Sequence, residues 1–334
     1  MSILKKLYSR SSRKAHHLFG DAMHFVGTDN NIYSQARGSR IMVYHGICQD
    51  APTRFNTLFI TKATFEEHLK VYKKHFNIIT LADFYDRRFS NDKFNICLTF
   101  DDGFANNYHY VLPLLEQYQL PATFFVTAIN AAGYDILWND FLSIAGKLGP
   151  AEFTFKNEIY YKNHYNKYVS FKGVALAERL RHGSFDEKAE LLHVLDKLTS
   201  FHRDKQHPDY WLQMTGEQIK ALSASQYATI GSHGYYHNDL SLIDTASAEK
   251  EVVQSKNYLE NLTGKEINSI AFPYGAYNAD VLNIAQKTGY KQLLATEFNI
   301  PQDQSEPALR ERLTINPFIS TTNQMYATIR GEYY

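Results

Sequence analysis

The chain has 334 residues, enough for two domains or one large barrel, and it can bury a full core without disulfides or structural metals. Basic and acidic residues number 35 each, so the formal net charge is zero and gives no electrostatic sign of a nucleic-acid-binding protein. Apolar residues make up 44% of the chain and charged residues 21%, an ordinary globular composition. Cys48 and Cys97 are too few for a disulfide framework or a thiolate zinc site.

Residues 1–38 form a basic segment that differs from the rest of the chain. Across 3–26, apolar residues recur at steps of three and four, which predicts an amphipathic helix that ends at Gly27 and the polar residues 28–31. The apolar stripe includes Leu4, Leu7, Leu18, Phe19 and Met23, and the basic residues Lys5, Lys6, Arg10, Arg13 and Lys14 lie mainly off it. Such a helix can lie on an anionic membrane surface, or it can pack on its own barrel or on a second subunit.

The N-terminus lacks the uninterrupted apolar run of a secretory signal, and no run in the chain approaches the ~18 apolar residues of a membrane span. We therefore expect an intracellular protein, either free in the cytoplasm or peripheral at the inner face of a bacterial membrane. No oligomeric state follows from the sequence.

From Ser39 to residue 334, short apolar runs alternate with helical patterns. Strands are predicted at 40–44, 95–100, 122–127, 228–232, 269–272 and 292–296, and helices at 64–75, 107–118, 215–223, 246–262 and 278–289. Repeated strand–helix units predict a parallel sheet, and their number favours a barrel. Residues 139–214 interrupt this rhythm with a predicted hairpin at 152–162 and a charged helix at 185–198. They are interpreted as an insertion after the third strand region.

The predicted strand at 95–100 ends in T-F-D-D-G, which contains Asp101 and Asp102. In a βα barrel the active site forms at the C-terminal ends of the strands. Adjacent carboxylates there point in different directions, so they suit a division of labour in which one binds a metal and the other takes a proton. An Asp-Gly turn that caps a helix is the alternative interpretation.

His233 and His237 follow the predicted strand at 228–232. Two neutral imidazoles and one carboxylate leave open positions on a divalent ion, as a catalytic metal requires. Among 14 histidines such a pair arises readily by chance, so surface or capping histidines are the alternative. Pro273-Tyr274-Gly275 follows another predicted strand and can present a backbone N–H and an aromatic wall, although it can equally be a simple turn.

Together and in this order, the three segments resemble the polysaccharide deacetylase family, carbohydrate esterase family four. The first family motif, T-F-D-D-G, stands unchanged at 99–103, and the third ends in P-Y-G, here 273–275. The second motif, a His-x3-His pattern, corresponds to His233–His237, with Gly234 where Ser or Thr is usual. The resemblance spans about 40–315 and includes M-V-Y-H-G-I at 42–47. It also includes D-I-L-W-N-D at 135–140, similar to the Trp-containing fourth motif.

The resemblance implies a distorted (β/α)7 barrel and assigns roles to individual residues. Asp101 would be the general base, and Asp102, His233 and His237 would bind one divalent metal ion, with Zn²⁺ as the first choice and other divalent ions as alternatives. The residues implied in substrate binding are Pro273, Tyr274, Gly275, Trp138 and Asp140. The chemistry agrees, because an acetamide is a poor electrophile that a metal can polarise while a base deprotonates the attacking water.

Two departures from the family pattern affect the catalytic groups. Many members carry an Arg at the start of the third motif that orients the base, whereas this chain has Ser269-Ile270-Ala271, so the orienting cation comes from elsewhere or is absent. The fifth motif normally supplies a general-acid His, and the matching stretch at 312–316 has none. His45, after the first strand, is the nearest substitute, although a buried structural role fits it equally, and Glu297 is a weaker candidate.

We therefore expect a metal-dependent N-deacetylase, a hydrolase of carbon–nitrogen bonds that releases acetate from an N-acetylated sugar in a glycan or glycan precursor. If residues 3–26 contact a membrane, the substrate is expected to be a lipid-linked sugar. A related hydrolase acting on a non-sugar amide is one alternative. A non-catalytic glycan-binding relative is the other, favoured by the missing His and Arg.

Overall fold

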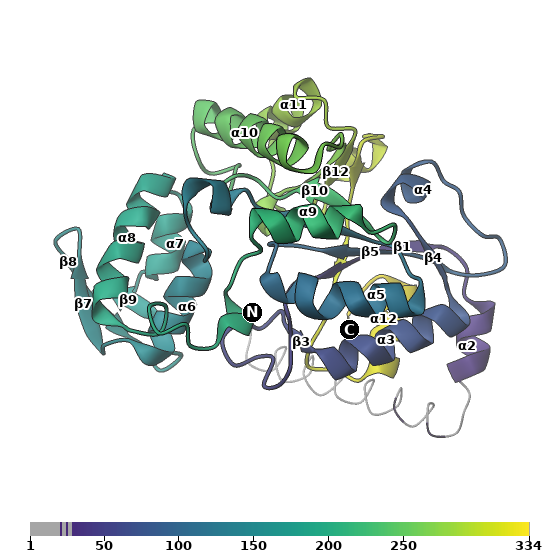
Figure 1. Ribbon diagram of the computed structural model, residues 1–334, viewed down its shortest axis with the longest axis horizontal. Helices are drawn as coiled ribbons and strands as arrows, with labels where there is room; N and C mark the ends of the chain where they lie inside the picture. The colour runs from purple at the N-terminus through teal and green to yellow at the C-terminus, as the bar shows by residue number, and fades with distance from the viewer. Residues whose placement is uncertain (1–20, 22–24, 26–28, 334) are drawn as a thin grey trace.

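The structure is a computed structural model that describes residues 21, 25 and 29–333 (Figure 1). Its centre is a curled parallel sheet with the strand order β13-β12-β11-β10-β6-β5-β1-β14, and β4 pairs with β5 beside this path. The strands are β1 (Ser39–Tyr44), β4 (Asn77–Ile79), β5 (Asn95–Phe100), β6 (Ala122–Val126), β10 (Ala228–Ser232), β11 (Ser269–Ala271), β12 (Gln292–Leu294), β13 (Leu309–Arg310) and β14 (Leu313–Thr314). The predicted parallel α/β architecture is confirmed.

The two ends of the strand order meet through a very short connection. β13 pairs with β12 and β14 pairs with β1, yet only Glu311 and Arg312 separate β13 from β14 in the chain. The chain therefore crosses the seam between the sheet edges within two residues, and this draws the sheet into a distorted barrel.

Strand register brings the sequence motifs to one edge of the sheet. Phe100 at the end of β5 pairs with Tyr44 of β1 and with Phe124 of β6, and Ser232 at the end of β10 pairs with Val126 and Ile270. Because all these strands are parallel, the residues that follow them emerge on the same side. The segments after β5, β10 and β11 therefore converge.

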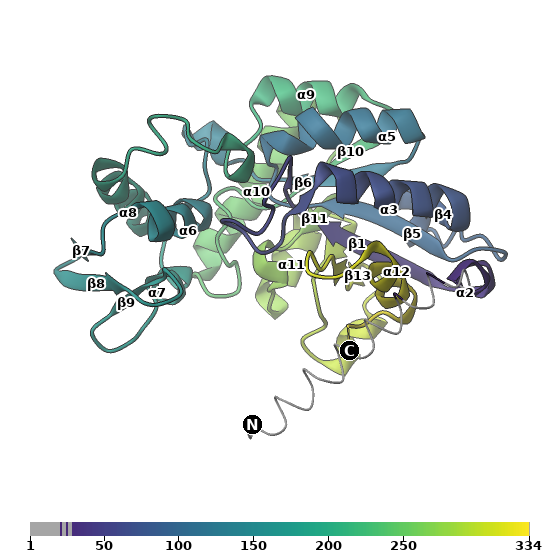
Figure 2. The ribbon, with the colours of Figure 1, turned by 90° about the horizontal axis from the view of Figure 1, so that it is seen from below.

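Helices cover the outside of the sheet, as Figures 1 and 2 show. They are α2 (Asp29–Gln35), α3 (Lys62–His75), α4 (Leu81–Tyr85), α5 (Leu112–Tyr118), α9 (Gly216–Ala224), α10 (Thr245–Thr263), α11 (Ala279–Lys287) and α12 (Thr321–Arg330). The longer helices pack through apolar residues, as α3 does with Phe65, Leu69 and Tyr72. The start of α9 carries a capping box between Thr215 and Gln218, as its sequence predicts.

The insertion forms a lobe beside the barrel, at the left of Figure 1. It contains α6 (Trp138–Leu148), α7 (Leu176–Arg181), α8 (Phe185–Leu198) and an antiparallel sheet of β7 (Glu152–Phe155), β8 (Glu158–Lys162) and β9 (Tyr168–Ser170). The predicted hairpin is β7–β8, and its turn residues Lys156 and Asn157 have φ values of 52° and 62°, as a tight hairpin turn requires. The predicted helix at 185–198 is α8.

Several elements differ from the sequence-based expectation. The helix predicted at 107–118 is a π-helical turn at Asn107–Val111 followed by α5, because Pro113 cannot donate a regular helical hydrogen bond. The two-residue strands β2 (Ile47–Cys48), β3 (Ile60–Thr61), β13 and β14 are too short to show alternation, and α12 was not predicted.

Residues 29–31, part of the polar stretch expected to follow the N-terminal helix, are themselves helical and begin α2, whereas the predicted end at Gly27 lies outside the described residues. Tyr33 of α2 is buried and its ring contacts those of His75, Phe76 and Tyr326. This part of the segment therefore packs on the barrel. The predicted membrane stripe at 3–26 lies outside the described residues, Asp21 and Phe25 excepted. Across the described part of the chain, no helix combines the length and apolarity that crossing a bilayer demands.

Candidate metal centre and catalytic base

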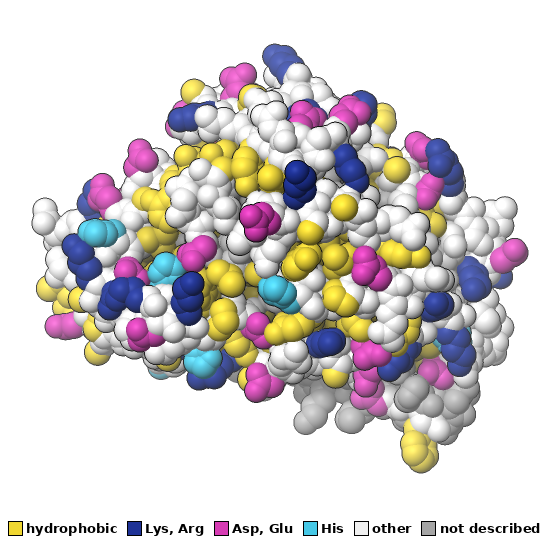
Figure 3. Space-filling view, viewed as in Figure 1, with side chains coloured by type: hydrophobic (Ala, Val, Ile, Leu, Met, Phe, Trp, Pro, Cys, Tyr) yellow, Lys and Arg dark blue, Asp and Glu magenta, His cyan; other side chains and the backbone are white. Residues whose placement is uncertain are grey.

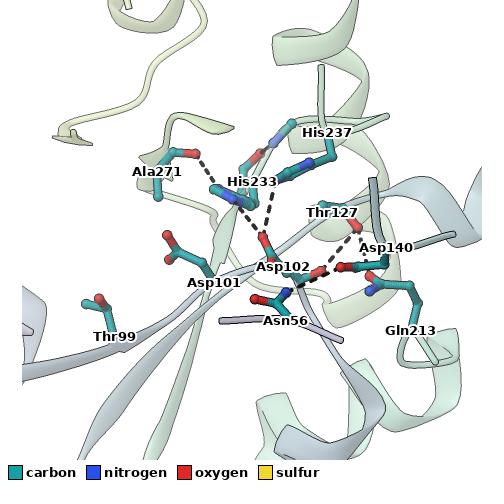
Figure 4. Close-up of polar contacts among 12 residues, drawn as sticks. Asn56, Thr99, Asp101, Asp102, Thr127, Asp140, Gln213, His233, His237 and Ala271 are labelled. Carbon is teal, nitrogen blue, oxygen red and sulfur yellow. Dashed lines mark hydrogen bonds and ion pairs between the residues drawn. The ribbon is translucent and has the colours of Figure 1, made fainter. Parts of the chain in front are cut away.

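Asp102, His233 and His237 come together at the C-terminal edge of the sheet (Figure 4). Asp102 Oδ1 lies 3.3 Å from His233 Nε2 and 3.2 Å from His237 Nε2. All three side chains are buried. Burial would raise the pKa of Asp102, but hydrogen bonds with the two imidazoles hold it well below its usual range, so the carboxylate stays ionised.

The donor set fits a divalent ion. Ligand atoms held 2.0–2.1 Å from Zn²⁺ at tetrahedral angles lie about 3.3 Å apart, which matches the distances from Asp102 Oδ1 to the two Nε2 atoms. His233 Nδ1 lies 2.8 Å from the carbonyl oxygen of Ala271 and donates to it, so Nε2 is the ring nitrogen that would bind a metal after losing the proton it shares with Asp102.

The backbone of the second motif explains its departure from the family pattern. Gly234 has a φ of +76°, a left-handed conformation that glycine adopts without strain. The turn that follows brings His237 back to the same carboxylate as His233. The Gly at this position is therefore compatible with the same pair of histidines.

Asp101 is held apart from the metal-ligand set by Arg312. The guanidinium donates to both carboxylate oxygens, with Nη1–Oδ1 and Nη2–Oδ2 distances of 2.8 Å each. Both side chains are almost fully buried, at 0% and 5% exposure. Burial would raise the pKa of Asp101, but the charge of Arg312 overcomes this and the pKa is lowered. Asp101 is therefore an oriented, ionised carboxylate.

Arg312 supplies the orienting cation that the third motif lacks in this chain. The sequence alone did not reveal this role. The residue lies between β13 and β14, at the barrel seam, where it also donates to Ala295 O and Thr99 Oγ1. In the sequence, the stretch 312–316 differs from the fifth family motif by its missing His, and nothing else in it indicates a catalytic role. The absence of an Arg from the third motif was the one available signal that a cation must come from elsewhere.

The third motif forms a short 3-10 turn, Pro273–Gly275 (η4), against the metal-ligand loop. Tyr274 has a φ of +61°, and its ring centroid lies 4.8 Å from that of His237. A Cβ on Gly275 would lie 2.1 Å from Thr296 Oγ1, so only glycine fits there. The Tyr274 hydroxyl is buried and has no hydrogen-bond partner in the described structure, which leaves it available to a ligand.

Trp138 and Asp140 lie in the first turn of α6, and they differ in where they point. Asp140 faces the site and accepts a 3.3 Å hydrogen bond from Asn56 Nδ2, while its Oδ2 is buried and has no partner among residues 29–333 (Figure 4). Burial, with Asp102 nearby, raises its pKa well above the usual range. Trp138 is 2% exposed and packs in the core of the lobe, with Lys188 Nζ 5.0 Å from its ring centroid.

Gln213 is a further residue at the site that the sequence did not reveal. Its oxygen accepts from Thr127 Oγ1, while its Nε2 is buried without a partner among the described residues. Backbone hydrogen bonds link Gln213 to Asp135 and Met214 to Gly103, which fixes the side chain beside the first motif (Figure 4). Asp140 and Gln213 thus offer polar atoms that substrate can satisfy.

His45 lies among the same charged groups, whereas Glu297 does not. Burial lowers the pKa of His45, against the opposing charges of Asp102 and Asp101, and its Nδ1 is buried without a partner in the described part of the chain. Glu297 is exposed and borders a cavity of about 240 Å³ at the seam, together with Arg40.

The insertion holds the loop that carries His237. Arg181 of α7 donates to Asp239 at 2.7 Å, and its guanidinium lies 4.7 Å from the Tyr274 ring centroid. The fully buried Lys188 of α8 donates to Asn238. The lobe therefore supports both the metal-ligand loop and the third motif.

The sequence and the fold match known proteins. A model of the polysaccharide deacetylase family matches residues 90–156 and 191–293, about half of the chain. YxkH of Bacillus subtilis (strain 168), which carries the same family name, is 23% identical over 287 residues, 84% of this chain and 72% of YxkH.

Solved structures of deacetylases share the fold. The Streptococcus pyogenes deacetylase PplD in complex with acetate has a TM-score of 0.55 at 18% identity, over 87% of this chain and 97% of that chain. IcaB from Ammonifex degensii has a TM-score of 0.53 at 16% identity, over 89% and 98%. The chain belongs to the polysaccharide deacetylase family and is a hydrolase of the carbon–nitrogen bond in N-acetyl groups.

Replacing Arg312 with Gln should impair both stability and activity. Removal of one partner from a buried ion pair typically costs about 3–5 kcal/mol, which urea denaturation would measure. An Asp101 side chain free to rotate should lower acetate release about 10²-fold. Arg312→Lys keeps the charge but cannot bond both carboxylate oxygens at once. Its stability and its activity should lie between those of the wild type and of Arg312→Gln. Wild-type stability and turnover in Arg312→Gln would contradict a positioning role.

Proposed function

We propose that this hydrolase removes the acetyl group from an N-acetylated sugar of a glycan or glycan precursor and depends on one divalent metal ion. The observation that carries the proposal is the buried set of Asp102, His233 and His237 beside an Asp101 that Arg312 holds separately. Two adjacent carboxylates with different partners suit two different tasks.

Asp102, His233 and His237 would hold the ion, with Zn²⁺ as the first choice. When bound, a divalent ion polarises the acetamide carbonyl and lowers the pKa of a water. Asp101, ionised and oriented, accepts the proton of the water that attacks the carbonyl carbon. A backbone N–H in the turn around Tyr274 stabilises the negative charge that develops on the carbonyl oxygen.

His45 is the proposed donor of the proton that the leaving amine requires. The charges of Asp102 and Asp101 favour the protonated form that a donor needs, against burial, which lowers the pKa of His45. The absence of a His at 312–316 leaves this role open to His45. The carbon–nitrogen bond then breaks, and acetate and the free amine leave. Tyr274, Gly275 and Pro273 would form one wall for the sugar and Asp140 of α6 another, whereas Trp138, buried in the core of the lobe, would support α6 from behind.

Acetate release from N-acetylated glycans, measured with and without a chelator, tests the proposal directly. We expect release that stops with chelator and returns when Zn²⁺ is restored. Release from simple amides but not from glycans would favour the non-sugar hydrolase. Glycan binding without release would favour a non-catalytic relative.

Asp101→Asn should retain the metal and lose most of the activity. The substitution removes the base and leaves the three metal-ligand side chains unchanged, and loss of a general base typically costs about 10²–10⁴-fold. Metal content by atomic emission and acetate release should be measured on the same sample. Activity within a few-fold of the wild type would show that another group acts as the base.

His237→Ala should abolish stoichiometric metal binding while the protein remains folded. Two ligands bind a divalent ion far more weakly than three, and the barrel has its own large core. Equilibrium dialysis measures the metal and circular dichroism the fold, with His164→Ala, at an exposed histidine of the lobe, as a matched control. Undiminished metal affinity in His237→Ala would refute the ligand assignment.

We also propose a peripheral membrane contact through residues 3–26, with a lipid-linked sugar as the substrate and the cytoplasmic face of a bacterial membrane as the location. The support is the basic amphipathic pattern of the sequence, in which cations near an anionic surface contribute about 1 kcal/mol each. Packing on the barrel or on a second subunit is the competing use of the same stripe.

Sedimentation with anionic vesicles separates these uses. The full chain should pellet at low salt and be released at high salt, whereas a chain that begins at Asp29 should stay in the supernatant. Starting at Asp29 retains α2, whose Tyr33 packs on the barrel, so the shorter chain keeps its folded core. Equal behaviour of the two chains would exclude the membrane contact.

A further inference from the structure

A second cavity, of about 650 Å³, lies between the insertion and the loop that precedes β3. One wall is α6 with Asn139, Ser143 and Lys147, and another is the segment Thr53–Thr57. The lobe completes the cavity with Tyr165–Tyr168 and Glu178. The residues contributed by the lobe lie within 157–190, between the two stretches that match the polysaccharide deacetylase family. This part of the cavity is therefore not covered by the family match.

The cavity and the candidate catalytic site share a wall. Asp140, Ser143 and Lys147 lie on one face of α6, since residues three, four and seven apart align along a helix. Each is bonded to the same short loop: Asp140 to Asn56, Ser143 to Phe55 O at 2.6 Å, and Lys147 to Arg54 O. Lys147 is seven residues beyond Asp140, about 10 Å along the helix axis. α6 therefore links the two places, because Asp140 in its first turn faces the candidate catalytic site and Lys147 near its end lines the cavity.

The charges of the lining indicate an anionic ligand. Arg54, Lys147 and Lys167 face a single acidic residue, Glu178, which leaves two positive charges in excess. In the described part of the chain, no carboxylate lies within ion-pair distance of these three cations, whereas Glu178 has His182 at 3.8 Å. On the face drawn in Figure 3, acidic and basic side chains otherwise mix without a field of one sign.

The remaining lining suits a sugar. Thr53, Thr57 and Asn166 offer neutral hydrogen-bonding groups for hydroxyls. Tyr165 is 70% exposed, and its ring, which contacts that of His164 at 3.8 Å between centroids, offers an aromatic surface at the rim of the cavity. Arg54 and Lys147 both lie over the Phe55 ring, at 5.0 and 5.7 Å from its centroid, which holds the two cations on one side of the cavity.

We propose that this cavity binds the phosphate of a phosphate-linked N-acetylated sugar while the acetamide occupies the metal site. A diphosphate that links a sugar to a carrier has one ionised oxygen on each phosphorus and carries a charge of about −2, which matches the two positive charges in excess in the lining. The placement of the acetamide at the metal site rests on the proposed function, whereas the binding of phosphate in the cavity does not. The phosphate can belong to a nucleotide or to a lipid carrier, and the substrates below distinguish them.

The first experiment tests whether the cavity of the metal-loaded protein binds phosphate. Calorimetric titration with inorganic pyrophosphate should show binding that weakens about tenfold or more in Lys147→Gln and in Arg54→Gln. Any pyrophosphate held by the metal is common to all variants, so the difference reports the cavity. Lys197→Gln, at an exposed lysine of α8 outside the cavity, is the matched control and should bind as the wild type does.

Kinetics then link the cavity to the reaction. Acetate release should be compared for a neutral N-acetylglucosamine oligomer, UDP-N-acetylglucosamine and a prenyl-diphosphate-linked N-acetylglucosamine. Lys147→Gln should raise KM for the two phosphate-bearing substrates about tenfold and leave KM for the neutral oligomer unchanged. Of the UDP-linked and prenyl-diphosphate-linked substrates, the one with the lower KM in the wild type identifies the carrier.

The outcomes separate the two proposals. Unchanged pyrophosphate affinity in Lys147→Gln and Arg54→Gln, or an equal loss in Lys197→Gln, overturns the cavity assignment. Equal effects on neutral and phosphate-bearing substrates overturn its role in catalysis. If no glycan releases acetate, the proposed function fails, while the pyrophosphate titration still decides whether the cavity binds phosphate.

Discussion

The buried ion pair between Asp101 and Arg312 is the interaction on which the rest of the site depends. It fixes both oxygens of one carboxylate, so that only its neighbour Asp102 turns toward His233 and His237. A buried carboxylate without a partner would be protonated or displaced. With the partner in place, the protein keeps two ionised carboxylates in adjacent positions and gives them different surroundings.

The barrel seam makes this pair possible. Arg312 is 211 residues away from Asp101 in the chain and reaches it because β13 and β14 close the sheet edges within two residues of each other. The insertion acts from the opposite side, where Arg181 and Lys188 bond to the loop that follows His237. Barrel closure and the lobe therefore position different parts of one site.

The features that could be predicted from the sequence are those that depend on local pattern. Asp101, Asp102, His233 and His237 follow apolar strands, and parallel strands bring such positions to a common edge. The hairpin turn at Lys156–Asn157 and the helix at 185–198 are likewise local features. The family motifs led to the correct family and fold, as the family model and the shared architecture confirm.

Long-range contacts were the part that the sequence could not reveal. Nothing in the stretch around Arg312 shows that its side chain crosses the seam, and the two-residue strands beside it carry no periodicity. Gln213 reaches the site only because its backbone pairs with the segment after Gly103. Residues 29–31 look polar and helix-ending, yet burial of Tyr33 against three aromatic rings stabilises α2.

Anomalous diffraction from crystals grown with zinc would show which of the two neighbouring carboxylates binds the metal. We expect one anomalous peak within bonding distance of Asp102 Oδ1, His233 Nε2 and His237 Nε2, with Asp101 still held by both guanidinium nitrogens of Arg312. A peak bonded to Asp101, or a metal bound elsewhere with these side chains unliganded, would contradict this division of labour.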